Sequence, residues 1–214
     1  MALRNLVQLG AVTPQNDFYE LTLEGWELLK LGIEPWLGKI ILRCFHHCLG
    51  KEGLVLAAVM ANSSSIFCRV GTEENKIKSD RLKVQFCHQS GDVFTLLAVY
   101  KEWEAVPCDR KNIWFWENSI NAKSMCRCLE GVQELDSCLP NELSIIIPSY
   151  WRWNPKILTE HDETLRSIIL SAFAENVAMY SGYDHLGYEV ALTGKHIQIH
   201  PSCSYLFLIQ DLVG

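Results

Sequence analysis

The sequence lacks the features that mark a membrane-spanning, exported or strongly basic protein. Its longest unbroken apolar run, residues 54–61, is far shorter than the roughly 20 residues that cross a bilayer. The first six residues contain neither an apolar signal core nor an Arg- and Ser-rich transit pattern. Acidic residues outnumber basic ones 25 to 19, which argues against strong autonomous binding to nucleic-acid phosphates. We therefore expect an intracellular protein of the nucleus or cytoplasm, with no membrane span.

The sequence also lacks nucleotide-binding and catalytic motifs. A phosphate-binding loop needs a hydroxyl residue after its Gly-Lys pair, and neither Gly38-Lys39 nor Gly194-Lys195 is followed by one. Asp162-Glu163 matches an acidic helix start better than a magnesium-binding motif. The seven histidines show no spacing typical of a catalytic triad. We expect neither catalytic residues nor a bound cofactor in this chain.

Nine cysteines are many for such a chain, but their number is odd and their spacing matches no disulfide framework. We expect most of them to be buried thiols. Cys44, His47 and Cys48 fall within about one helical turn, and Cys126 and Cys128 can in principle complete a tetrahedral zinc site. A zinc-binding domain therefore remains an alternative.

The residues that are present predict an α+β fold, since 49% of the 214 residues are hydrophobic and support a substantial core. Apolar residues at spacings of three and four predict helices over 2–9, 22–29, 36–49, 52–61, 79–88, 92–104, 121–137 and from 159 onwards. Between them, 13–20 is expected to be a turn between extended pieces, Pro35 a helix end, and 62–80 largely a polar loop. Alternating apolar residues after Gly182 predict three strands, at 188–192, 197–199 and 205–209.

One segment combines aromatic and basic residues, namely Tyr150-Trp-Arg-Trp-Asn-Pro-Lys156. Such a mixture can stack bases and hold phosphates of single-stranded nucleic acid, with Trp151, Arg152 and Lys156 as contacts. The same composition also occurs where a connecting segment is anchored to a core. Both interpretations remain open from the sequence.

Several segments, in order, resemble the C-terminal accessory region of DEAH-box RNA helicases. They are 2–12 (ALRNLVQLGAV) with 21–25 (LTLEG), 35–42 (PWLGKIIL) with 48–61, 91–100 (GDVFTLLAVY) with 116–124 (WENSINAKS), and 172–176 (AFAEN) with 182–183 and 199–202 (IHPS). The sequence of 116–124 is most similar to that of plant proteins that fuse a DEAH helicase to RING-between-RING ubiquitin-ligase domains. This resemblance covers nearly the whole chain.

The resemblance implies a winged-helix remnant at 1–24, a helical ratchet (helicase-associated) domain at 25–182 and a partial oligonucleotide-binding (OB) fold at 183–214. It implies a passive wall of the channel for single-stranded RNA, with Lys123, Arg127 and Arg152 beside the phosphates. Val132 stands where many relatives carry an arginine. ATP and magnesium would belong to the RecA-like motor of a longer parent, so we expect no enzymatic activity from this chain alone.

A rival interpretation is a stand-alone protein-interaction module that binds a helicase or another partner through the open sheet edge near 186–209. The net charge of −6 favours this alternative, whereas the ordered matches favour the helicase accessory region. The abrupt start and the three-strand sheet also predict that the chain is cut from a longer protein.

Overall fold

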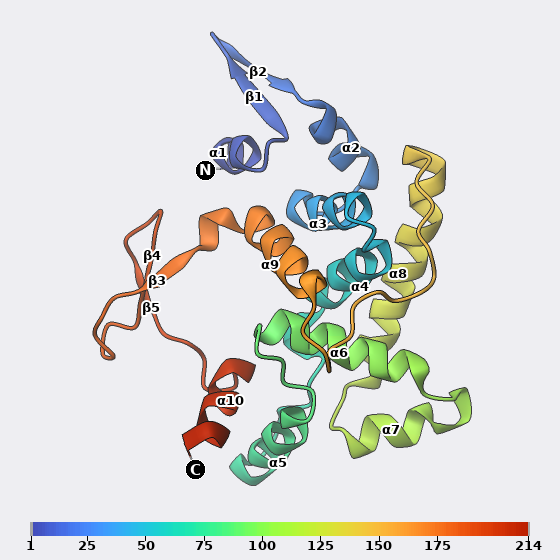
Figure 1. Cartoon of the computed structure of the whole chain (residues 1–214), viewed down its shortest axis with the longest axis vertical. Coiled ribbons are helices and arrows are strands. Elements are labelled where there is room, and N and C mark those ends of the chain that lie inside the picture. Colours follow the sequence, from blue (N-terminus) through green and yellow to red (C-terminus); the bar gives the residue numbers. More distant parts are fainter. Residues whose placement is uncertain (1, 214) are drawn as a thin grey trace.

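The computed structural model describes residues 2–213 and confirms an α+β fold that is mostly helical (Figure 1). Two small antiparallel sheets accompany the helices in this part of the chain. No helix within residues 2–213 combines the length and the apolar character that crossing a bilayer requires. The predicted domain boundaries at 24 and 182 stay predictions, and their outermost residues, 1 and 214, lie outside the described range.

The N-terminal unit consists of helix α1 (Ala2–Gln8), a hairpin of β1 (Val12–Gln15) and β2 (Phe18–Leu21), and helix α2 (Leu23–Leu31). Thr22 caps α2 as predicted, because its Oγ1 accepts a hydrogen bond of 2.9 Å from the Gly25 N–H. Gly25 lets the helix approach the chain closely, since an added Cβ would lie 2.0 Å from the Ala11 carbonyl oxygen. The hairpin confirms the predicted turn between extended pieces.

Pro35 was expected to end helix α2, and that expectation is wrong. The helix ends at Gly32, whose φ of 64° provides the left-handed cap, and Pro35 instead begins helix α3 (Pro35–His46). Proline is tolerated there because the first residues of a helix have no backbone acceptor for their N–H groups.

The core is built around helix α4 (Gly50–Ala61), which is buried from Glu52 to Val59. Helices α3, α6 (Asp92–Ala105) and α8 (Ala122–Leu143) pack against it, and α9 (Glu160–Ala172) lies beside α3 (Figure 1). The sequence predicted all five helices, although α8 continues through Pro140 well past residue 137. The capping box predicted at Thr159 is present, with Asp162 bonded back to the Thr159 N–H.

Two peripheral helices differ from the sequence-based expectations. Helix α5 (Glu73–Val84) begins inside the segment expected to be a loop, because Thr72 caps it and acidic residues occupy its first turn. Helix α7 (Lys111–Glu117) follows a short 3₁₀ turn, η2 (Cys108–Arg110), and was not anticipated. Two other 3₁₀ turns, η1 (Ser63–Ser65) and η3 (Ala174–Asn176), follow α4 and α9.

The C-terminal sheet has the order β3 (Ala178–Tyr180), β4 (Tyr188–Val190) and β5 (His196–Ile197). The strand predicted at 205–209 is wrong, because this segment belongs to helix α10 (Ser204–Val213). A short apolar run fits a strand or a helix equally well, and tertiary contacts decide here. The Ser204 hydroxyl and backbone N–H both donate to Asp92 at the start of α6, which docks the first turn of α10.

Candidate nucleic-acid interface

Lys123 and Arg127 lie on one exposed face at the beginning of α8. Asn121 caps this helix, since its Oδ1 accepts hydrogen bonds from the backbone N–H groups of Lys123 (3.1 Å) and Ser124 (3.3 Å). Ser124 and Cys128 point into the core, so the residues before them in the helical turn face solvent. Among the side chains that the structure describes, those of residues 3–208, neither basic group has a hydrogen-bond or ion-pair partner. Both cations are therefore available to an external anion.

The charge order along α8 is opposite to the order that stabilises a helix. No acidic residue lies in its first turn and no basic residue in its last, while exposed acidic residues follow further on: Glu130, Glu134, Asp136 and Glu142. The helix dipole favours anions near the N-terminus, so Lys123 at the second helical position carries a small energetic cost. The same arrangement adds side-chain charge to the positive end of the dipole and makes this end attractive to phosphate.

Trp151 is half-buried, and its polar edge already has a partner. The indole N–H donates to Glu104 Oε2 at 2.7 Å. The ammonium groups of Lys51 and Lys101 lie 5.7 and 5.3 Å from the ring centroid. The ring therefore takes part in cation–π contacts within the protein, which leaves less of its face for a base.

Arg152 and Lys156 are exposed. The Arg152 guanidinium donates to the Tyr150 hydroxyl at 3.1 Å and lies 5.5 Å from the Tyr150 ring. Lys156 lines a cavity of about 500 Å³ together with Lys101 and His88. These two side chains can reach a phosphate without any rearrangement of the backbone.

The backbone between these residues is anchored in the core. Glu52 is almost fully buried, and its Oε1 accepts hydrogen bonds from the N–H groups of Arg152 (2.7 Å) and Trp153 (2.8 Å). Trp153 is fully buried and donates its indole N–H to Asp162 at 2.9 Å. The Lys101 ammonium donates to the Trp153 carbonyl. The anchoring interpretation of this segment is thus confirmed for its centre, whereas RNA contacts at Trp151, Arg152 and Lys156 stay a prediction.

The predicted contacts form two separate groups. Lys123 and Arg127 share a face of α8, whereas Trp151, Arg152 and Lys156 belong to the segment that crosses α4 and α6. Among residues 2–213, no hydrogen bond, ion pair or ring contact joins the two groups.

Gly38-Lys39 and Gly194-Lys195 do not form phosphate-binding loops. Lys39 is buried in α3 and donates to the Leu9 carbonyl at 2.5 Å, and burial lowers the pKa of its ammonium group. Lys195 lies in the turn between β4 and β5. These positions tie segments of the fold together or cap a hairpin, so they provide no cradle of backbone N–H groups for a nucleotide.

The cysteines are distributed differently from the expectation of mostly buried thiols. All nine are free, but only Cys44 and Cys128 are fully buried. Burial raises the pKa of the Cys44 thiol, and it raises the pKa of Cys128 to about 11, so both favour the protonated form over the thiolate that zinc requires. No group of three or more potential ligands within the described chain is placed to hold a metal ion.

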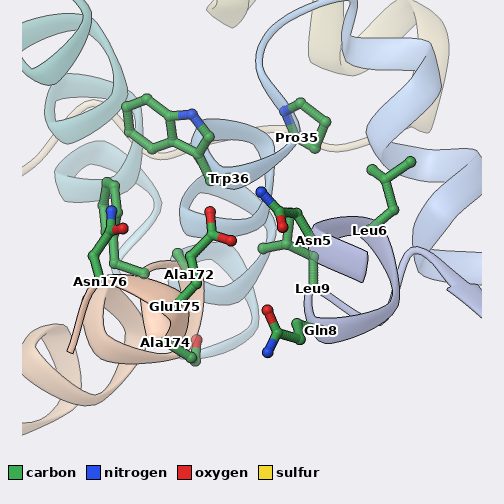
Figure 2. A pocket seen from close by; sticks show the side chains of 12 residues that line it. Asn5, Leu6, Gln8, Leu9, Pro35, Trp36, Ala172, Ala174, Glu175 and Asn176 are labelled. Atoms are coloured by element: carbon green, nitrogen blue, oxygen red, sulfur yellow. The ribbon is translucent and has the colours of Figure 1, made fainter. Parts of the chain in front are cut away.

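A cavity of about 480 Å³ separates α1 from the first turn of α3 and the end of α9 (Figure 2). Trp36 forms one wall, and Asn5 and Asn176 lie near its rim (Figure 2). Glu175 is the one charged residue among those that line it. A carboxylate repels phosphate, so this cavity is a poor candidate for the RNA backbone.

The sequence analysis did not identify Trp116 as a surface residue. Trp116 is the last residue of the Trp-Phe-Trp run of α7. Trp114 and Phe115 are buried, and Trp116 faces solvent beside the start of α8. Successive residues of a helix are turned by about 100°, so the outward direction of Trp116 can be predicted only when the helix and its buried face are known.

No protein-family model matches the chain. Two curated proteins of Arabidopsis thaliana are each 64% identical to it over 206 residues: ATP-dependent RNA helicase DEAH12, chloroplastic, and ATP-dependent RNA helicase DEAH11, chloroplastic. Each match covers 96% of this chain, which spans only 12% of the length of either relative. The chloroplastic designation of both relatives overturns the expectation of a nuclear or cytoplasmic location. The plant DEAH resemblance is confirmed to this extent: the chain is a close homologue of one region of plant DEAH-box ATP-dependent RNA helicases.

Proposed function

We propose that this chain is the RNA-binding accessory region of a DEAH-box ATP-dependent RNA helicase. In this proposal, a helical ratchet at 25–182 follows a winged-helix end at 1–24 and precedes a partial OB fold at 183–214. The observation that carries it is the 64% identity, over 206 residues, to two proteins named as such helicases. The ATPase motor, with its ATP and magnesium, would lie in RecA-like domains outside this chain.

The charge distribution supports a role in holding the RNA backbone without reading its sequence. Lys123 and Arg127 are exposed, unpaired within the described residues and aligned on one helical face. Arg152 and Lys156 offer a second pair of exposed cations. With a net charge of −6, the chain depends on such local basic sites to attract phosphate.

The test is fluorescence anisotropy with a labelled single-stranded RNA at salt concentrations from about 50 to 200 mM. We expect Lys123→Ala and Arg127→Ala each to weaken binding several-fold at low salt and to reduce the slope of log K against log salt by about 0.7. Lys30→Ala is the matched control, because Lys30 is exposed and its ammonium group donates to the Glu142 backbone carbonyl at the opposite end of α8. A folded chain that binds no RNA at the lowest salt contradicts the proposal.

A second candidate, binding to a helicase core or another protein through the C-terminal sheet, is favoured by a different observation. The strands β3 and β5 are both edges, and Met179, Tyr180 and Ile197 expose large apolar side chains there. Co-purification with a helicase motor core that is lost on Met179→Lys or Ile197→Lys, in a chain that binds no RNA, would favour this candidate.

A further inference from the structure

Trp116 is the most exposed large hydrophobic side chain within the described residues, with 88% of its surface accessible. Its neighbours in the helix are packed against other rings. Trp114 and Phe86 form an edge-to-face pair with centroids 5.9 Å apart, and Phe115 stacks with Trp103 at a centroid distance of 6.0 Å. These two rings fix the rotation of α7 about its axis. The third aromatic residue of the run is consequently turned outward.

Hydrogen bonds hold the backbone at the end of α7, beside the Trp116 indole, in place. The Asn118 side chain donates to the Trp114 carbonyl at 2.8 Å and accepts from Gln85 at 2.8 Å. The Ser119 carbonyl accepts from the Cys68 N–H at 2.8 Å. A ring on such a rigid support loses little conformational entropy when a ligand stacks on it.

A groove of about 470 Å³ opens beside Trp116, between α5 and α7. Leu82, Phe115 and Ile120 contribute its apolar surface. Its polar groups are the side chains of Asn75, Asn112 and Ser119. Apolar walls with a few amide and hydroxyl groups suit a nucleobase, which has apolar faces and a polar edge.

Positive charge stands on two sides of this groove. Lys78 lines it from α5, and Ala122 lines it at the start of α8, directly before Lys123. Arg127 follows one turn further along the same face. Nearby exposed acids are Glu117 on α7 and Glu74 on α5, whereas Glu73 is paired with Lys76 at 2.6 Å and Asp80 with Arg69 at 2.9 Å. Lys78 is the one charged residue that lines the groove, so the groove favours an anionic ligand over a basic or neutral one.

We propose that Trp116 is a stacking platform for one unpaired base of single-stranded RNA, held at the groove between α5 and α7. Lys78 and Lys123 bind the phosphates on either side of that nucleotide. Every base has a π-face, so the site takes any of the four bases with little preference. The inference rests on the proposed RNA-binding function and adds to it a stacking contact with the face of a base, without recognition of its edge.

The test measures binding of a labelled oligouridine to the 214-residue chain by anisotropy at about 50 mM salt. We expect Trp116→Ala to weaken binding about 5- to 150-fold, the range that corresponds to the loss of one base–aromatic stack. Trp116→Tyr retains a ring and stays within a few-fold of the wild type. Trp26→Ala is the control, because Trp26 is an exposed tryptophan on α2, far along the chain from the groove.

An abasic oligonucleotide of the same length separates stacking from phosphate binding. The wild-type chain should bind it more weakly than oligouridine, whereas Trp116→Ala should bind both equally. If Lys123→Ala weakens binding while Trp116→Ala leaves it unchanged, the stacking inference is wrong and the proposed function survives, with Trp116 left as a protein-contact surface. If the folded wild-type chain binds neither oligonucleotide, both the inference and the proposed function fail.

Discussion

Two tryptophan-rich regions of this molecule have similar composition and opposite environments. In 150–156, the tryptophans lie near basic residues, but Trp153 is fully buried and Trp151 is held by Glu104. In α7, by contrast, Trp116 stands free beside the basic start of α8. An aromatic and basic composition therefore does not distinguish an anchor from a binding surface. Hydrogen-bond partners and burial make that distinction.

The sharpest test of this comparison exchanges the two tryptophans for alanine and measures urea unfolding. Trp153→Ala should lower the free energy of unfolding by about 3 to 5 kcal/mol, because it leaves a large cavity. It also leaves Asp162 without its indole partner. Trp116→Ala should change the free energy by less than about 0.5 kcal/mol, as expected for an exposed position. Equal losses of unfolding free energy in the two variants would show that Trp116, like Trp153, stabilises the fold.

A smaller effect is expected at Glu52, which holds the backbone of the anchored segment. Glu52→Ala removes the acceptor of the Arg152 and Trp153 N–H groups. The buried Trp153 group then costs about 1 to 3 kcal/mol, whereas the part-buried Arg152 group can bind water instead. Glu102→Ala, at an exposed position of α6, is the matched control. Chemical denaturation checks the loss of stability. An unchanged midpoint for Glu52→Ala would show that the segment is anchored by its rings alone.

The smallest effect concerns pH and His88, which packs beside the anchor. Burial lowers the pKa of His88 below its usual range, although the Asp162 carboxylate at 3.4 Å opposes this shift and Arg166 adds to it. Its Nδ1 accepts the Ser90 N–H at 3.1 Å, so protonation there would replace an acceptor with a second donor. The unfolded chain therefore takes up the proton first as pH falls.

It follows that stability contributed by neutral His88 is present above the ordinary histidine pKa of about 6.5 and is lost as pH falls below it. Melting temperatures at pH values on either side of this point should differ more for the wild type than for His88→Asn. A larger pH dependence in the variant would mean that the ion pair with Asp162, and not the neutral ring, stabilises the fold.

Much of the fold was predictable because its signals are local. The Thr22 cap, the Thr159 capping box and the apolar faces of α3, α4, α6, α8 and α9 depend on residues within a few positions of each other. The predicted strand at 205–209 failed because α10 is docked by Asp92, more than a hundred residues away. No local pattern contains that contact.

The candidate site was predictable only in part, for the same reason. Lys123 and Arg127 were expected from the resemblance to DEAH-box helicases, and both are exposed. Trp151 was predicted from the aromatic and basic composition of 150–156, yet its indole N–H and ring are already engaged by Glu104, Lys51 and Lys101. Those partners come from α4 and α6, so the sequence around Trp151 could not show them.

The sequence by itself determined the α+β class, most helix positions and the likeness to plant DEAH-box helicases, because caps, periodicity and ordered motifs are encoded along the chain. Only the tertiary structure decided which tryptophan is an anchor and which faces solvent. For Trp153, Glu52 on α4 accepts the backbone N–H and Asp162 on α9 accepts the indole N–H, and only the packing of these elements brings the three residues together. Trp103 is buried although its indole N–H has no hydrogen-bond partner, so ring packing between helices also holds a tryptophan in the core, because burying a large apolar surface can outweigh one unpaired N–H.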